Sequence, residues 1–379
     1  MGGFNEVEHD LEREVVRVGS GVKWGDVYRV LTPKNLTTVG GRLLDVGVAG
    51  LTLGGGLSYL SDREGLACDN VLNYEVLLAD GRIVNANTSS NVELFRALKG
   101  GGNNFGIVTH FTLRTFPQDF VWGGIRAYSY DQLPAILSAV AEYQSTPNKD
   151  LNANLMIQVP VTNASIGIIL NMVYLNPTAN PPAFRAFENL SSFADTVSIR
   201  SFEDFMADSL LLSTVDYPRW DFRTTTFLLN ASLYTEVFEL LANAHELTTL
   251  SNISSGTLVV GIQPIAETAV LQGDVRGGNS LGLSSRPQIW LSLNTGWRKS
   301  EDDVAVYGVS RDLAKKVEQL TRPSGHYHRY IFMNDASWDQ EVIQHYGDHN
   351  VARMRAVQAK YDPDRVFQDL VRGGWKLAL

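Results

Sequence analysis

The fold is decided by the stretch VGVAGLTLGGG at residues 46–56, the first of two glycine-rich stretches in a chain of 379 residues. Its glycines stand at positions 47, 50, 54, 55 and 56, among small and apolar residues. Because glycine has no Cβ, such a backbone lets a flat ring or a diphosphate approach closely and can turn successive N–H groups toward an anion. The stretch therefore indicates a cofactor site, although glycine clusters also occur in ordinary tight turns.

The second glycine-rich stretch is LKGGGNNFGIVT at residues 98–109, and GLACDNV at residues 65–71 lies between the two. Neither stretch has the G-x-G-x-x-G spacing of a Rossmann fingerprint, and no Gly-Lys-Ser/Thr of a Walker loop occurs. Each lies next to a predicted strand. Two glycine turns in this arrangement are more specific for a cofactor than either turn alone.

Hydrophobic patterns predict the surrounding elements. Before residue 120 we expect a strand at 14–18, a helix at 24–31, strands at 71–78 and 82–85 joined by the hairpin turn Asp80-Gly81, a helix at 93–98 and a strand at 107–114. After residue 120 glycine becomes rarer, which predicts a separate α+β lobe. There we expect helices at 133–143 and 182–190, strands at 154–161, 166–174, 257–262 and 289–293, and a helix at 348–359.

Composition excludes several classes of function. The chain has 32 basic and 41 acidic residues, a net charge of -9 and no run of like charges, so we expect no nucleic-acid partner. Cys68 is the one cysteine, which excludes an internal disulfide and a thiolate metal cluster. No apolar segment has the length of a signal peptide or a membrane span. Six Asn-X-Ser/Thr sequons nevertheless suggest a secreted or vacuolar ancestor and a glycoprotein, at Asn35, Asn87, Asn163, Asn189, Asn230 and Asn252.

Four segments together resemble one protein family. They are VRVGSGVKWGDVY at 16–28, the run from GGRLLDVGVAGLTLGGG to GRIVNAN at 40–87, ELFRALKGGGNNFGIVT at 93–109 and YGDHNVARMRAVQAKYDPDRVFQ at 346–368. They resemble the FAD-binding domain of the berberine-bridge-enzyme-like oxidoreductases, in the vanillyl-alcohol-oxidase or PCMH-type flavoprotein superfamily. The resemblance implies an α+β fold. A PCMH-type FAD-binding domain at 1–118, its N-terminal subdomain missing, would precede an inserted substrate domain of antiparallel sheet and helices at 119–345 and a berberine-bridge-type segment at 346–379.

The resemblance also implies site residues. Asn334 matches the Asn of the family's Tyr-x-Asn segment beside the flavin ring, and the expected cofactor-binding residues are Val46, Gly47, Gly50, Gly54, Gly55, Gly56, Asp69, Asn70, Val108 and Asn334. A flavin that takes hydride from carbon needs a side chain to accept the proton, and Tyr330 and Asp335 are the candidate catalytic residues. The spacings of His326 with His328 and of His345 with His349 could suit a metal, but no carboxylate pattern supports them, so we expect no metal.

Two departures from the family bear on the cofactor. Leu43 stands where many members have the cysteine that binds flavin C6, so we expect non-cysteinyl FAD. The family's other anchor is a histidine in an Arg/Lys-x-Gly-Gly-His loop that precedes the segment matching residues 16–28, and this chain begins almost there. We therefore expect FAD without the usual histidine linkage.

The leading interpretation is an FAD-linked oxidoreductase that oxidises a small organic molecule in secondary metabolism, with hydride passing to flavin N5 and O2 reoxidising the flavin. The alternative is a flavin-free relative that acts as a pericyclase or cyclase or binds a small molecule. A third interpretation, a flavoenzyme chain shortened at its N-terminus, shares the first function. The sequence indicates no membrane partner, and it does not indicate the substrate, the oligomeric state or the compartment.

Overall fold

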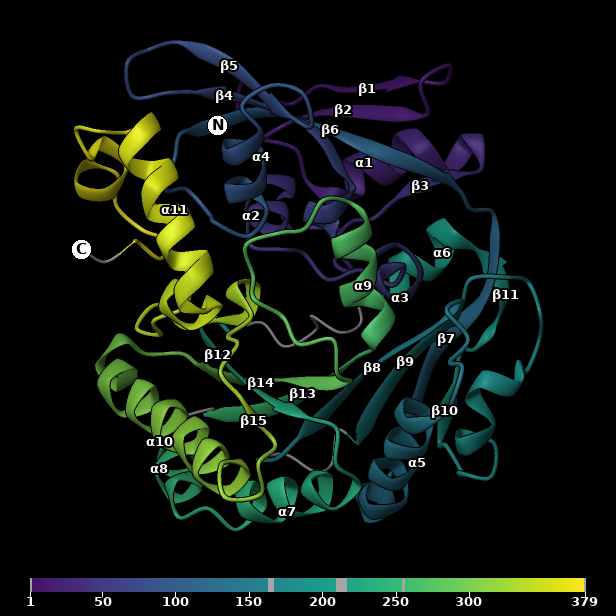
Figure 1. Cartoon of the computed structure of the whole chain (residues 1–379). Coiled ribbons are helices and arrows are strands. Elements are labelled where there is room, and N and C mark those ends of the chain that lie inside the picture. Colours follow the sequence, from purple (N-terminus) through teal and green to yellow (C-terminus); the bar gives the residue numbers. More distant parts are fainter. Residues whose placement is uncertain (1, 163–166, 209–216, 254–255, 378–379) are drawn as a thin grey trace.

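The computed structural model describes residues 2–162, 167–208, 217–253 and 256–377. Its elements form two antiparallel sheets, one from the first third of the chain and a larger one from the middle (Figure 1). The first sheet ends with a strand that stops at Pro117, and the second begins at Phe120, so the predicted domain boundary falls between them. The α+β class expected from the sequence is confirmed.

The smaller sheet is built around its long strand β6 (Ile107–Pro117), which pairs with β2, β3 and β4. The order is β1-β2-β6-β4-β5, with β3 beside β6. The Asp80-Gly81 hairpin is confirmed: Leu77 lies opposite Ile83, and Gly81 has the left-handed φ of 84° that the turn requires. The remaining bounds are β1 (Val7–Asp10), β2 (Val15–Gly19), β3 (Leu36–Thr38), β4 (Val71–Leu77) and β5 (Ile83–Asn87).

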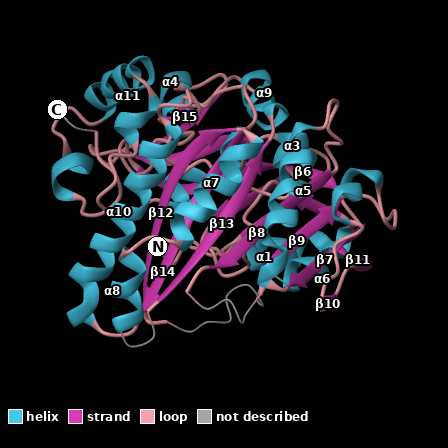
Figure 2. Cartoon of the chain, turned by 90° about the horizontal axis from the view of Figure 1, so that it is seen from below, coloured by secondary structure: helices cyan, strands magenta, loops and turns pink. Residues whose placement is uncertain are grey.

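The larger sheet has the order β10-β7-β9-β8-β13-β14-β12-β15, with β11 beside β7. Figure 2 shows its long strands side by side as one continuous layer. Every pair in it is antiparallel. The bounds are β7 (Phe120–Tyr128), β8 (Ala153–Pro160), β9 (Ile168–Tyr174), β10 (Ala194–Asp195), β11 (Ser198–Ser201), β12 (Arg219–Leu228), β13 (Thr257–Ile265), β14 (Gln288–Trp297) and β15 (Tyr327–His328).

Four helices cover one face of the larger sheet, and the smaller sheet with its helices lies on the other side (Figure 1). The four are α5 (Leu133–Ser145), α7 (Ala231–Ala242), α8 (Glu246–Asn252) and α10 (Asp303–Thr321). The remaining helices are α1 (Trp24–Leu31), α2 (Val48–Leu53), α3 (Ser61–Glu64), α4 (Val92–Leu98), α6 (Phe202–Ala207), α9 (Glu267–Val275) and α11 (Asp348–Tyr361). Within the described ranges, no helix is both long enough and apolar enough to cross a bilayer.

Strand alternation separates the two faces of the larger sheet. Ile157, Leu170 and Val260 belong to the apolar core shared with the four covering helices. On the opposite face, Asn171 lies across from Met156, and Gln158 lies across from Gly261. This second face is more polar and is turned toward the smaller sheet.

The expected elements are present at slightly different bounds, with two exceptions. The expected helix at 182–190 is only a 3₁₀ segment, Pro182–Phe187, because the backbone at Phe184 leaves helical geometry. The glycine stretch at 46–56 is not simply a turn, since Val48–Leu53 forms α2. Of the expected strand at 166–174, residue 166 lies outside the described residues.

Candidate functional site

Two glycines of the first stretch present bare backbone on an open surface. Gly47 precedes α2 and Gly50 lies inside it; both are exposed, and a Cβ added at either would meet no atom within 4 Å. Backbone hydrogen bonds to residues 22–24 fix the start of the helix: Val48 N–H donates to the carbonyl of Val22 at 2.9 Å, and Trp24 N–H donates to that of Val46 at 3.0 Å. The open surface of Gly47 and Gly50 could therefore accept a flat group at close range.

The other three glycines of the stretch are buried and contact protein. A Cβ at Gly54 would overlap the side chain of Asn334, and one at Gly56 would meet Leu51 and Ala67. Gly55 and Gly56 have φ values of 112° and 80°, which side-chain-bearing residues rarely adopt. These glycines give the chain its turn after α2, rather than a surface for a ligand.

Asn334 joins this turn to the C-terminal third of the chain. Its Oδ1 accepts a hydrogen bond from Gly56 N–H at 3.0 Å, and its Nδ2 donates to the carbonyls of Gly50 and Leu51, each at 3.2 Å. The side chain thus gives Gly56 N–H a partner and adds a second donor to two carbonyls that also accept from Gly54 N–H at the end of α2. The structure brings Asn334 together with the glycine stretch, as the sequence resemblance predicts.

Asp69, Asn70 and Val108 are all buried and do not lie with Gly47 and Gly50 on the open surface. The Asp69 carboxylate accepts hydrogen bonds from Leu66 N–H and from Asn279 Nδ2, each at 3.0 Å. Asn70 Nδ2 donates to the carbonyl of Glu64 at the end of α3 and to that of Leu66, and Val108 lies within the pairing of β4 and β6. In this structure the three residues shape the interior behind the glycine turn.

Asp335 lies at one end of a part-buried polar chain, centred on the buried Gln263, that sequence analysis did not find. Gln263 on β13 donates from Nε2 to Asp335 Oδ2 at 2.7 Å, and its Oε1 accepts a hydrogen bond from Arg42. The Arg42 guanidinium also lies 6.0 Å from the ring centre of Tyr59. Burial raises the pKa of Asp335, although the hydrogen bond from Gln263 and the charge of Arg42 act in the opposite direction. The carboxyl group therefore holds a proton to a higher pH than an exposed aspartate does.

Tyr330, the other candidate base, lies in the apolar core and is fully buried. Its ring stacks on Tyr346 at 5.7 Å and packs against Trp290 at 5.1 Å. Its hydroxyl has no hydrogen-bond partner among the residues that the structure describes, and burial raises the pKa of Tyr330 well above the usual value. The structure thus does not join Tyr330 by hydrogen bond to Asp335 or to Asn334.

The polar face of the larger sheet adds further candidate ligand-binding residues. Asn171 is 1% exposed, and within the described ranges neither atom of its amide has a hydrogen-bond partner. The register places it on the same face as Gln158 and, through β13, as Gln263. An unsatisfied buried amide costs about 1–3 kcal/mol, so such a group is expected to serve a ligand or water. The asparagine within the apolar run IILNMVY at 168–174 was the sequence signal that could have revealed it.

The sequons and histidines have other placements. Asn35, Asn189 and Asn252 are exposed, Asn87 and Asn230 are half-buried, and Asn163 lies outside the described residues. Glycosylation stays a prediction. His326 Nδ1 lies 2.7 Å from the Ser324 carbonyl and His345 Nδ1 lies 2.6 Å from the Glu341 carbonyl, so each has a local backbone partner.

Comparisons with known proteins agree with these features. A family described as an FAD binding domain matches residues 1–87. The bifunctional solanapyrone synthase of Alternaria solani is 33% identical over 377 residues, which cover 100% of this chain and 72% of the relative. An FAD-dependent monooxygenase of Cochliobolus heterostrophus is 35% identical over 393 residues, covering 100% of this chain and 75% of the relative.

Solved structures share the fold. The xylooligosaccharide oxidase of Myceliophthora thermophila has a TM-score of 0.77 at 19% identity and matches 100% of this chain and 80% of that protein. The berberine-bridge-enzyme-like protein 1 of Physcomitrella patens has a TM-score of 0.75 at 17% identity, and the match covers 97% of this chain and 79% of that protein. The expected PCMH-type FAD-binding fold is confirmed.

Proposed function

Because this chain belongs to the berberine-bridge-enzyme-like FAD-linked oxidoreductases, we propose that it oxidises a small organic molecule of secondary metabolism. The observation that carries the proposal is the pair Asn334 and Asp335: the first binds the glycine turn and the second binds the polar chain on the larger sheet. FAD, when bound, would supply the two-electron acceptor for hydride from the substrate carbon, at flavin N5. The open backbone of Gly47 and Gly50 fits such a group, because no side chain stands in its way.

We assign to Asp335 the role of the base that accepts the substrate proton at a carboxylate oxygen. Gln263 fixes one of its oxygens at 2.7 Å and is itself fixed by Arg42, so the carboxyl group has a defined direction. Burial raises the pKa of Asp335, which brings it nearer to the working pH and makes it a better base than an exposed aspartate. Arg42 carries a positive charge beside this pair and favours the ionised form.

The polar face of the larger sheet is the proposed substrate surface. Asn171, buried without a partner for either amide atom, could both donate to and accept from a hydroxyl or carbonyl of the substrate. Secondary metabolism is supported by the name of the solanapyrone synthase relative, and O2 as final acceptor by the oxidases among the structural neighbours. Asn171→Leu is expected to stabilise the protein by about 1–3 kcal/mol while weakening substrate binding, since it removes an unsatisfied buried amide.

We further propose that FAD forms no bond to cysteine here. Glucooligosaccharide oxidase of Acremonium strictum carries 6-S-cysteinyl, 8α-N1-histidyl FAD. Leu43 stands in place of the family cysteine, and Cys68, the one cysteine of the sequence, is fully buried beside Asp69. Burial raises the pKa of the Cys68 thiol well above its usual value, which disfavours the nucleophilic thiolate. Mass spectrometry of the FAD-loaded protein should find the Cys68 peptide unmodified, and a flavin adduct on it would contradict the proposal.

The test begins with titration of purified protein with FAD, followed by exposure to panels of alcohols and polyketide-like substrates with detection of hydrogen peroxide. We expect a flavin-dependent product with Asp335→Asn strongly impaired, while the control Asp312→Asn, an exposed position on α10, keeps full activity. A colourless protein that ignores FAD and still converts a substrate without redox change would refute the oxidoreductase. It would favour the flavin-free cyclase.

A further inference from the structure

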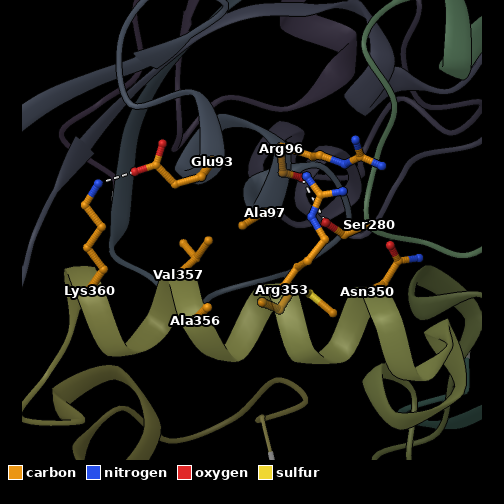
Figure 3. Close-up of a pocket in the computed structure, with 10 residues that line it drawn as sticks. Glu93, Arg96, Ala97, Ser280, Asn350, Arg353, Ala356, Val357 and Lys360 are labelled. Carbon is orange, nitrogen blue, oxygen red and sulfur yellow. Dashed lines mark hydrogen bonds and ion pairs between the residues drawn. The ribbon is translucent and has the colours of Figure 1, made fainter.

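A separate cavity of about 410 Å³ lies between α4 and α11. Figure 3 shows the side chains around it, which come from α4, from α11 and from the loop after α9. None of them is a residue assigned above to FAD or to the substrate. The lining consists of Glu93, Arg96, Ala97, Ser280, Asn350, Arg353, Met354, Ala356, Val357 and Lys360.

One end of the cavity carries two arginines, Arg96 and Arg353, that form no ion pair among the described residues. In Figure 3 the side chains of Arg96 and Arg353 reach the same end, next to Ser280. Burial lowers the pKa of Arg96 and the nearby charge of Arg353 lowers it further, whereas the charge of Asp274 acts in the opposite direction. Across the described chain, neither guanidinium has a carboxylate oxygen within ion-pair distance. The charge of Asp274 offsets part of the repulsion at Arg96, but no carboxylate in the described part of the chain forms an ion pair with either guanidinium, so both can bind an added anion.

The position of Arg96 is fixed by its surroundings. A Cβ at Gly278 would lie 3.2 Å from the Arg96 Cζ, so the guanidinium packs directly over glycine backbone. Ser280 donates to the Arg96 carbonyl at 3.0 Å and ties the loop after α9 to the end of α4. A guanidinium held in this way loses less freedom when it binds an oxyanion.

The other end of the cavity is already neutral. Lys360 forms an ion pair with Glu93, and the Tyr361 hydroxyl donates to the same carboxylate at 2.8 Å. The hydrogen bond from Lys360 lowers the pKa of Glu93 to about 2, so this carboxylate stays ionised and paired. Between the two ends, the apolar side chains of Ala97, Met354 and Val357 line the cavity and are buried.

We propose that this cavity binds an organic oxyanion, with a phosphate or carboxylate head on Arg96 and Arg353 and a compact apolar body over Ala97, Met354 and Val357. Guanidinium groups bind such heads through paired, charge-assisted hydrogen bonds. A volume of about 410 Å³ is within the range of small-molecule sites and exceeds what a bare inorganic ion fills. The protein as a whole carries a charge of -9, so the attraction for the anion is local to this arginine pair.

The test is calorimetric titration of the FAD-loaded protein with four probes. Phenyl phosphate and benzoate separate the two head groups, inorganic phosphate lacks the apolar body, and benzyl alcohol lacks the charge. We expect one-to-one binding of phenyl phosphate or benzoate that is tighter than that of inorganic phosphate, and none of benzyl alcohol. Equal binding of benzyl alcohol, or no binding of either organic anion, would overturn the proposal.

Variants locate the binding. Arg353→Gln, at an exposed position, and Arg96→Gln should each weaken the organic anion about tenfold to a hundredfold, because each removes a charge-assisted contact. Arg355→Gln, on the same helix but outside the lining, should leave affinity unchanged. Affinity unchanged in Arg353→Gln would refute the site. Displacement of the probe by FAD in cofactor-free protein would refute it as well, since the cavity would then belong to the cofactor.

Discussion

Gly50→Ala should change protein stability and FAD affinity in opposite directions. Gly50 lies inside α2 on its exposed side, and an added Cβ meets no protein atom within 4 Å. Alanine favours a helix interior over glycine by about 0.5–1 kcal/mol, so the cofactor-free variant should be more stable by roughly that amount.

FAD affinity should fall in the same variant, because the new methyl group stands on the surface proposed for the flavin. Inserting a methyl into a close contact typically costs about 1–3 kcal/mol. Since about 1.4 kcal/mol corresponds to a factor of ten, the Kd for FAD should rise roughly tenfold to a hundredfold.

Urea unfolding without FAD measures the first effect, and a fluorescence titration with FAD measures the second. Gly308→Ala is the matched control, because Gly308 also lies inside a helix, α10, and its added Cβ also meets no atom within 4 Å. The control should be stabilised similarly and should bind FAD as the original protein does.

An unchanged Kd in Gly50→Ala would show that the flavin does not contact α2. Loss of stability in the cofactor-free variant would show that α2 does not form as described. Each result refutes a different step of the reasoning.

Other predictions follow from contacts further into the protein. Gly54→Ala should destabilise the protein by about 2 kcal/mol in urea unfolding, because the added Cβ overlaps the Asn334 side chain. In the Asn334→Ala background this destabilisation should fall by at least half. Equal destabilisation in the two backgrounds would contradict the contact. Burial raises the pKa of Asp335, so its neutral form stabilises the fold, and that contribution is lost as the pH rises through the raised pKa. Asp335→Asn should remove this loss of stability from a series of melting temperatures measured at different pH values. An unaltered series would contradict the raised pKa of Asp335. Burial alone would raise the pKa of Glu75, but hydrogen bonds from Thr109 and His110 lower it below the usual value. The ionised Glu75 therefore stabilises the fold at neutral pH, and this stabilisation is lost as the pH falls through the lowered pKa. Glu75→Gln should therefore flatten the acid side of the stability curve, whereas a curve as steep as the original would argue against this network.

The elements around the glycine stretches were predictable because local signals agree there. Helix α1 buries one side with the spacing of an amphipathic helix, through Trp24, Val27, Tyr28 and Leu31. Asp80-Gly81 marks the hairpin between β4 and β5. The glycine stretch itself was harder, since glycine disfavours a helix. α2 forms because the backbone of Val22 and Trp24 holds its first turn, a tertiary effect that no local pattern contains.

The residues around Asp335 show why part of the site escaped prediction. Arg42 and Gln263 are far apart in sequence, and each stands in a segment whose local pattern does not single it out. They meet because the register of β13 with β14 turns Gln263 to the face that carries Asn171. Asn334 was found only through family resemblance, which carries long-range information that periodicity lacks.

The placement of the site depends on one short 3₁₀ turn, Met333–Asp335. Within it, Asn334 is bonded to the glycine stretch and its neighbour Asp335 is bonded to the larger sheet through Gln263. Because the two residues are adjacent, the distance between the glycine surface and the carboxyl group is set by one peptide unit rather than by the packing of two lobes. A small rearrangement between the sheets would therefore act on the hydrogen bond between Gln263 and Asp335, while Asn334 keeps the turn on the glycine stretch. The direction of the Asp335 carboxyl group thus depends on the turn and on the larger sheet together.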